Sequence, residues 1–165
     1  MSTVAATGGS KAVRVIGILS AIAGLVLLIA GGVTWGMVSS QLAEENITVS
    51  EDAAAFGGQQ VTSPWTAFAQ ADIINEHALK ATDGKTYAEL EQDDPLRATA
   101  MNASFLRASL FTSVVAFGVA ALVMGLGVLF VLVGYSLWVL AGRKVATVVD
   151  SRPASPVSGT EPIKA

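Results

Sequence analysis

The chain has 165 residues and a mass of 16.9 kDa, with 52% hydrophobic residues, 14% charged residues and a mean hydropathy of +0.58. Soluble domains usually carry about 25% charged residues, so this composition argues against a freely soluble domain, excludes a chain disordered throughout and favours a small membrane protein. The absence of Cys excludes disulfides, thiolate zinc sites and cysteine nucleophiles, and the net charge of −3 predicts no nucleic-acid partner.

The first predicted element is a transmembrane helix over residues 13–38, preceded by a disordered cytoplasmic tail over residues 1–12. Val15 to Val38 are 24 residues without a charge, which is enough to cross a hydrocarbon core of about 30 Å. A cleaved signal peptide is the alternative, because Val38-Ser39-Ser40 is compatible with a cleavage site. The apolar stretch is longer than that of a typical signal peptide, so we expect an uncleaved anchor.

Residues 39–94 are predicted to form an extracytoplasmic helical cap. Ser63-Pro64 predicts a helix from Pro64 to about Ala81, because Ser caps free N–H groups and Pro fits the first helical position. Thr86 followed by Glu89 is a capping box, which predicts a short helix over residues 87–92. The first of these helices has an apolar face that should pack on a neighbour. Its members are Ala67, Phe68, Ala71, Ile74, Ala78, Leu79 and Ala81.

One long helix is predicted over residues 95–142, and it includes the second transmembrane span. Asp94-Pro95 repeats the combination of a cap and a proline, and no residue breaks the helix before Gly142. Its 35 uncharged residues from 108 to 142 exceed the length of one span, so we expect its first turns to stand outside the bilayer. There the stripe of Met101, Phe105 and Ala108 should pack against the helix of residues 64–81.

The ends of the spans carry residues typical of membrane interfaces. A disordered cytoplasmic tail over residues 143–165 is predicted after the second span. Aromatic rings with a polar edge favour the headgroup region, and basic residues favour the cytoplasmic side. The predicted interface anchors are Trp35, Tyr135, Trp138, Arg143 and Lys144.

The charges beside the spans predict the orientation. Each tail carries a net charge of +2, whereas residues 39–107 hold eleven acidic and four basic residues. Because basic residues stay on the cytoplasmic side, we expect a multi-pass protein of the plasma membrane with both termini in the cytoplasm.

Small residues in the two spans are the candidate functional residues. The predicted helix-packing residues are Gly17, Gly24, Gly31, Gly32, Gly36, Gly118, Ala121 and Gly125. The first three recur every seven residues, the next two form a GxxxG pair, and the last three form a similar stripe in the second span. Small residues let membrane helices approach closely. Two uses stay open: packing of the two spans of one chain, or contact with a partner's helix or a second copy.

No catalytic, metal-binding or cofactor-binding residues are predicted. His77 is the single imidazole, and its helical neighbours offer no metal partner. Neither span contains a charged residue, so an ion-coupled carrier or a proton relay has no visible residues to use.

Four segments of the sequence carry a resemblance to a known family. They are NITVSEDA from Asn46, AQADIINEHAL from Ala69, GKTYAEL from Gly84 and MNASFLRASLFTSVVAFG from Met101. In these segments, and over most of residues 13–143, the chain resembles a family of small two-span membrane proteins of actinobacteria, often labelled "aromatic ring-opening dioxygenase". The resemblance implies two spans and a bacterial plasma membrane. Iron-dependent ring cleavage needs an open iron site, for which one His and no Cys are insufficient, so we do not expect an enzyme.

The predicted fold class is an all-α integral membrane protein, a two-helix transmembrane hairpin with a small extracytoplasmic helical cap. The predicted function is that of a non-catalytic accessory or scaffold protein, which binds another membrane protein through its cap or its glycine-striped spans. A homo-oligomeric channel-like protein is the alternative. The expected partners are membrane lipid and a membrane protein or further copies of the chain.

Overall fold

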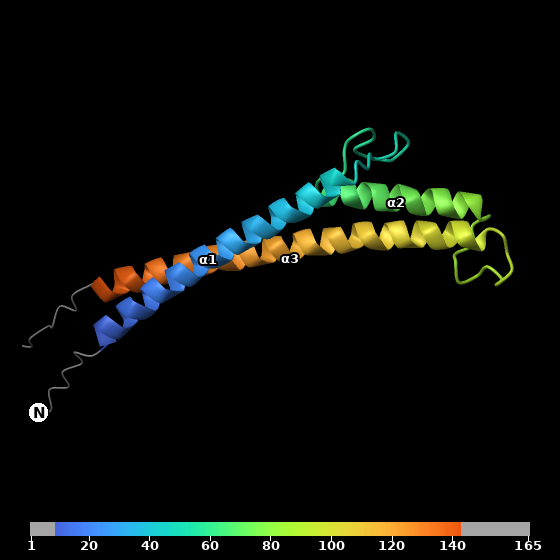
Figure 1. Cartoon of the computed structure of the whole chain (residues 1–165). Helices are drawn as coiled ribbons and strands as arrows, with labels where there is room; N and C mark the ends of the chain where they lie inside the picture. The colour runs from blue at the N-terminus through green and yellow to red at the C-terminus, as the bar shows by residue number, and fades with distance from the viewer. Residues whose placement is uncertain (1–8, 143–165) are drawn as a thin grey trace, which may run out of the picture.

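The computed structural model describes residues 9–142, which form three helices (Figure 1). They are α1 (Gly9–Glu44), α2 (Pro64–Ala81) and α3 (Arg97–Gly142). This part of the chain contains no strand, and one isolated antiparallel bridge joins Thr48 and Gln60. The prediction of an all-helical fold is therefore confirmed.

The two long helices lie antiparallel and side by side (Figure 1). With 36 and 46 residues, α1 and α3 are about 54 and 69 Å long at the standard rise. Both are long and apolar enough to cross a membrane. Only 11% and 17% of their most apolar segments are buried, so nearly all of this apolar surface faces outward, unlike that of a core helix in a soluble protein.

The helix α1 is longer than the predicted first span, and α3 nearly matches the predicted long helix. The segment 13–38 lies inside α1, which continues unbroken to Glu44. The long helix begins at Arg97 rather than Pro95, after a turn in which the Leu96 N–H donates to Asp94 Oδ1 at 2.8 Å. Residues 9–12 of the predicted N-terminal tail belong to α1, and residues 1–8 and 143–165 lie outside the described residues.

Local signals set both ends of α2, as predicted from the sequence. Ser63 caps the helix: the Thr66 N–H donates to Ser63 Oγ at 3.3 Å, and the Ser63 N–H donates to Thr66 Oγ1 at 3.1 Å. At the other end, the Thr82 hydroxyl donates to the carbonyl oxygen of Ala78 at 2.9 Å. Asp83 and Gly84 follow with φ +51° and +81°, a left-handed backbone that ends the helix and that glycine adopts readily.

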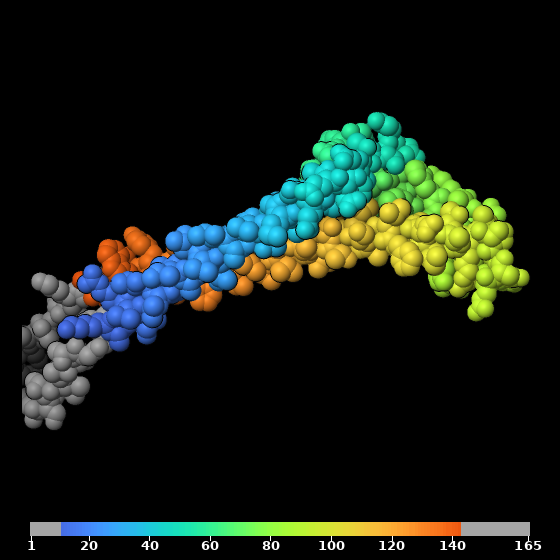
Figure 2. All heavy atoms as spheres, viewed as in Figure 1, coloured from blue at the N-terminus to red at the C-terminus, as the bar shows by residue number. Residues whose placement is uncertain are grey.

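The buried side chains gather where α1 ends, α2 begins and α3 passes beneath both. Space-filling atoms show this region as the thicker end of an otherwise slender molecule (Figure 2). The core consists of Leu42, Val49, Val61, Ala67, Ala71, Leu110 and Phe117. Trp35 packs edge-on against Phe117, with ring centroids 4.7 Å apart, and the Ser39 hydroxyl donates to the Thr62 carbonyl at 2.7 Å. The C-terminal turns of α1 are therefore part of the same core as the segment that follows them.

The face of α2 that packs on α3 differs in part from the predicted one. Ala67 and Ala71 are buried as expected. Phe68, however, is 52% exposed, although its ring meets Phe111 of α3 edge-on, and Ile73 is buried instead. Loop 45–63 covers α2 from a second side, so the helix buries more than one stripe.

The predicted contact stripe on α3 is wrong. Met101, Phe105 and Ala108 are all exposed, and this part of α3 buries Ala100 and Leu110 instead. Apolar side chains surround α3 on all sides along most of its length, so the sequence pattern does not distinguish the face that α2 covers.

The predicted short helix over residues 87–92 is also wrong, because this segment forms turns. The capping contact itself is present: the Thr86 N–H donates to Glu89 Oε2 at 2.7 Å. Arg97 holds the segment in place, since its guanidinium donates to the Leu90 carbonyl and lies over the Tyr87 ring. A helix of six residues is not stable without a packing face, and here only Leu90 is buried.

Candidate functional site

The contact between α1 and α3 is made by small residues that recur every seven positions on both helices. They are Gly17, Gly24 and Gly31 on α1, and Gly134, Gly127 and Ala120 on α3. A Cβ added to Gly24 would lie 2.6 Å from the Gly127 carbonyl oxygen and 2.7 Å from the Val131 backbone nitrogen. The two backbones approach so closely that the contact has no room for a side chain at Gly24.

Sequence reasoning missed the α3 half of this contact. Gly118 and Gly125 precede Ala120 and Gly127 by two residues, which places them about 200° away around the helix. A Cβ added to either would meet no heavy atom within 4 Å among the described residues, and Ala121 is exposed. Gly118 and Gly125 are also seven residues apart, but Leu132 ends that run. Ala120, Gly127 and Gly134 form a run of three small residues at this spacing, as in α1, and this is the signal that could have identified the contact stripe.

The GxxxG pair of α1 also lies outside the contact. Gly32 and Gly36 have open space around an added Cβ within the described part of the chain. Both helices therefore present a second set of small residues on surfaces that residues 9–142 leave uncovered.

Two hydroxyl groups inside the long helices are paired with backbone carbonyls. Ser20 of α1 donates to the carbonyl oxygen of Phe130 in α3 at 3.0 Å, which adds a polar contact between the helices. Thr34 donates to the carbonyl oxygen of Ala30, one turn earlier in its own helix, at 2.9 Å.

The predicted interface anchors have different surroundings. Trp35 is half-buried against Phe117. Tyr135 and Trp138 are exposed at the other end of the helix pair, with ring centroids 6.4 Å apart. Arg143 and Lys144 lie outside the described residues.

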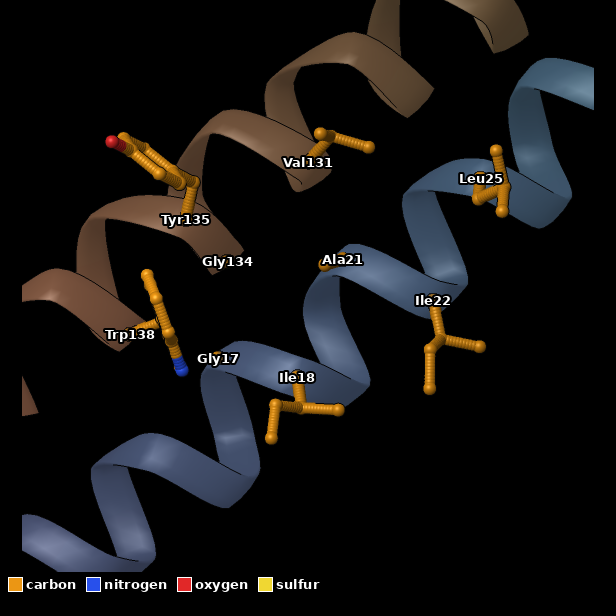
Figure 3. Close-up of a pocket in the computed structure, with 9 residues that line it drawn as sticks. All are labelled: Gly17, Ile18, Ala21, Ile22, Leu25, Val131, Gly134, Tyr135 and Trp138. Carbon is orange, nitrogen blue, oxygen red and sulfur yellow. The ribbon is translucent and has the colours of Figure 1, made fainter.

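An apolar groove of about 440 Å³ opens between α1 and α3 beside these two aromatic rings (Figure 3). Gly17, Ala21 and Gly134 form its floor, and larger side chains of both helices form its walls. The Tyr135 hydroxyl and the Trp138 indole N–H are the side-chain polar groups among the lining residues. This largely apolar groove suits hydrocarbon.

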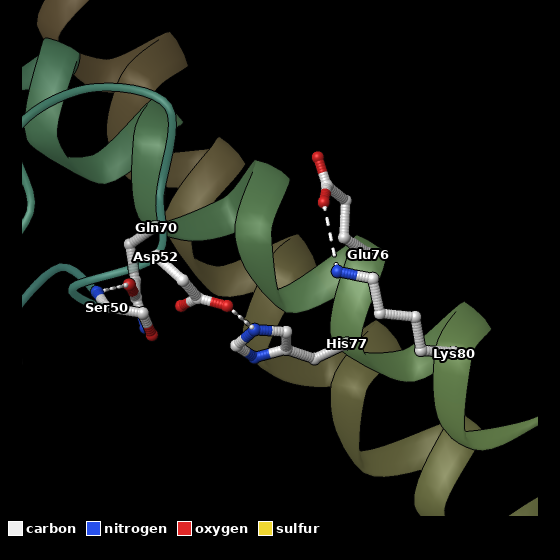
Figure 4. A network of polar contacts seen from close by, with 6 residues as sticks. All are labelled: Ser50, Asp52, Gln70, Glu76, His77 and Lys80. Atoms are coloured by element: carbon white, nitrogen blue, oxygen red, sulfur yellow. Dashed lines mark hydrogen bonds and ion pairs between the residues drawn. The ribbon is translucent and has the colours of Figure 1, made fainter.

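Polar contacts join loop 45–63 to α2 (Figure 4). His77 Nε2 lies 2.7 Å from Asp52 Oδ2, and the Ser50 N–H donates to the buried Gln70 Oε1 at 3.0 Å. His77 lies at the surface, with 45% of its side chain exposed. Its partner Asp52 is 25 residues away in sequence, and no local pattern points to the pair.

These contacts lower the pKa of two carboxyl groups. The hydrogen bond from the His77 imidazole holds the pKa of Asp52 below its ordinary value, and the N–H and hydroxyl of Thr86 do the same for the pKa of Glu89. Each of these hydrogen bonds favours the charged carboxylate over the protonated acid. Both groups lie in segments that connect helices.

We expect the fold to lose stability as the pH falls below about 4, where ordinary Asp and Glu side chains take up protons. A carboxyl group with a lowered pKa in the folded state stabilises the fold above its unfolded pKa, and this contribution disappears as the pH falls through the folded pKa. Asp52→Asn should therefore be less stable than the wild type at pH 7 and should lose less stability between pH 6 and pH 3. Equilibrium unfolding at a series of pH values tests this.

Asp72→Asn is the matched control, because Asp72 is an exposed carboxylate of α2 for which the described residues provide no hydrogen bond or ion pair. Its pH dependence should follow that of the wild type. If Asp52→Asn also followed the wild type, the contact with His77 would contribute nothing to the acid sensitivity.

Residues 9–142 contain no group of three or more His, Asp or Glu side chains placed to hold a metal ion. The candidate features are therefore the close contact between α1 and α3, the outward-facing small residues, and the polar contacts between loop 45–63 and α2. Comparisons with models of protein families, with curated proteins and with solved structures gave no match for this chain.

Proposed function

We propose that α1 and α3 form a transmembrane hairpin and that residues 45–96 form a cap outside the plasma membrane, with both termini in the cytoplasm. The outward-facing apolar surface of the two helices supports the insertion, because it would otherwise be exposed to water. The acidic charge between the helices supports the orientation. The packing of Trp35 and Leu42 into the cap core supports an uncleaved α1.

The register of the helix pair supports this placement in the bilayer. Gly24 lies against Gly127, so counting along the antiparallel helices places Val38 opposite about residue 113 of α3. Residues 108–112 then lie beyond the outer end of the charge-free part of α1, where Leu110 packs in the cap core. This accounts for an apolar run in α3 that is longer than one span.

Within this topology the chain acts as a non-catalytic accessory or scaffold protein that binds another membrane protein. The observation that carries the proposal is the apolar stripe of Met101, Phe105 and Leu106 on the part of α3 outside the span. All three side chains are exposed, Phe105 by 65%. An apolar surface that the described part of the chain leaves uncovered is typical of an interaction surface.

The unused small residues provide a second contact inside the bilayer. Gly32 and Gly36 on α1, and Gly118 and Gly125 on α3, leave space for the backbone of another helix to approach.

The accessory function involves no cofactor and no catalytic step. A channel would require a polar lumen, and the hydroxyls of Ser20 and Thr34 are already paired with backbone carbonyls.

Purification of the tagged chain in mild detergent, with mass spectrometry of co-eluting proteins, tests the function. We expect one membrane protein in a stoichiometric amount, and Phe105→Ala should lower its recovery by about tenfold or more, as for a central interface residue. Phe130→Ala is the control, because Phe130 is also exposed on α3 but lies inside the span.

Equal recovery with both variants would contradict docking through the stripe. A single homo-oligomer with nothing attached, together with conductance in liposomes, would replace the accessory function with that of a channel.

A further inference from the structure

We propose that the beginning of α2 is an interfacial anchor, whose aromatic side chains Trp65 and Phe68 insert into the headgroup region of the outer leaflet. This inference rests on the proposed insertion of α1 and α3 into the same bilayer. Trp65 is 69% exposed, the highest value among the exposed large apolar side chains in the described part of the chain. Residues 9–142 therefore leave most of this ring uncovered.

Two contacts and the direction of α2 set the depth of Trp65 along the molecule. The hydrogen bond from Ser39 places Thr62, just before α2, next to the end of the charge-free part of α1. The rings of Phe68 and Phe111 meet edge-on, 5.8 Å apart, and α2 runs antiparallel to α3. Counting from this pair places Trp65 level with about Val114, roughly 10 Å closer to the membrane centre than Arg107.

Helix geometry directs the aromatic rings toward the membrane. Side chains of a helix tilt toward its N-terminus. Because α2 begins at the level where the spans end and runs away from them, the tilt brings Trp65 and Phe68 back toward the bilayer. This end of α2 thus continues the apolar surface of the spans.

The surroundings of Trp65 change from apolar to acidic with distance from the spans. A groove of about 180 Å³ lies between loop 45–63 and α2, with Phe56, Trp65 and Phe68 among its lining residues. Asp72 and Glu76 also line it, and they lie about 10 and 16 Å farther along α2 than Trp65. This order matches the change from the lipid carbonyl region to water, where Trp is the preferred residue of the boundary.

Tryptophan fluorescence in vesicles of phosphatidylethanolamine and phosphatidylglycerol tests the anchor. Trp35→Phe with Trp138→Phe leaves Trp65 as the reporter, and circular dichroism checks that the variant folds. We expect blue-shifted emission from Trp65 and quenching by lipids brominated near the carbonyl region at least about threefold stronger than quenching by aqueous iodide.

Two further reporters calibrate the result. Each is introduced into a chain in which Trp35, Trp65 and Trp138 are all replaced by Phe. Leu126→Trp lies on the exposed apolar surface of α3 inside the span, and Tyr87→Trp lies at the far end of the cap. Lipid quenching of Leu126→Trp together with iodide quenching of Trp65 would overturn the anchor and leave the membrane topology intact. If neither lipid nor iodide quenched Trp65, its ring would be covered by protein, and the lipid assignment would be wrong. Iodide quenching of Leu126→Trp would overturn the topology, and the anchor with it.

Discussion

Replacing Gly24 by Ala is expected to destabilise the protein by about 2 kcal/mol, whereas replacing Gly32 by Ala should leave its stability unchanged or raise it by up to about 1 kcal/mol. Both glycines lie in the middle of α1, but only Gly24 faces α3. The new methyl group at Gly24 would meet backbone atoms of Gly127 and Val131 at 2.6 and 2.7 Å, and these atoms cannot move without separating the helices.

The expected changes in stability have opposite signs at Gly24 and Gly32, so comparing the two substitutions separates helix contact from helix propensity. Ala is the better helix former, so propensity alone predicts a gain at both positions. At Gly32 nothing in the described residues lies within 4 Å of the added Cβ, so a gain there should persist. Reversible unfolding in mixed micelles of mild detergent and SDS, followed by far-UV circular dichroism, measures both changes.

Equal effects of the two substitutions would show that the close contact between Gly24 and Gly127 does not hold the helices together. A loss of stability confined to Gly32→Ala in an oligomeric sample would instead place that glycine in contact with another chain. Gly127→Ala should reproduce the loss from the other side, because its Cβ would lie 2.7 Å from the Gly24 carbonyl oxygen.

The ends of α2 could be predicted from the sequence, because the residues that cap a helix lie within a few positions of its ends. Ser63 and Pro64 mark the first turn of α2, and the helix ends at Ala81 as predicted. The long uncharged runs predict α1 and α3 because a membrane-spanning helix needs about 20 consecutive apolar residues, and both helices are long and apolar enough to cross a membrane.

The contact faces were harder to predict, because the pattern of apolar residues in α3 has no preferred side. The predicted small-residue stripe of α3 differs from the one that faces α1, because Gly118 and Gly125 lie two positions from it. An error of two residues turns the helix by about 200°, which changes an inner face into an outer one. The period of seven fits both choices, and only the run of three small residues, Ala120, Gly127 and Gly134, repeats the pattern of α1 in full.

Contacts between distant segments left no local trace in the sequence. Asp52 meets His77 because loop 45–63 folds back along α2, and the course of a loop depends on which of its apolar residues become buried. Here these residues are Val49 and Val61, which are almost completely buried and flank the bridge between Thr48 and Gln60. Their burial positions Asp52 beside α2.

The largest single loss of stability is expected from Phe117→Ala, at about 3 to 5 kcal/mol. Phe117 is only 1% exposed and belongs to the core that joins α1, loop 45–63, α2 and α3. Removing its ring leaves a cavity and deletes the edge-on contact with Trp35, which adds about 0.5 to 1.5 kcal/mol beyond burial of the ring. The cap and the helix pair should therefore loosen together.

Phe130→Ala removes the same side chain from an exposed position of the same helix and should cost less than about 1 kcal/mol. Unfolding in mixed micelles gives the two free energies, and the emission of Trp35 in a chain with Trp65→Phe and Trp138→Phe reports on the core. Phe117→Ala should shift this emission, and Phe130→Ala should not. Equal losses for the two variants would mean that lipid or detergent fills the space left by Phe117 as readily as it covers Phe130, so that the junction is not a closed core.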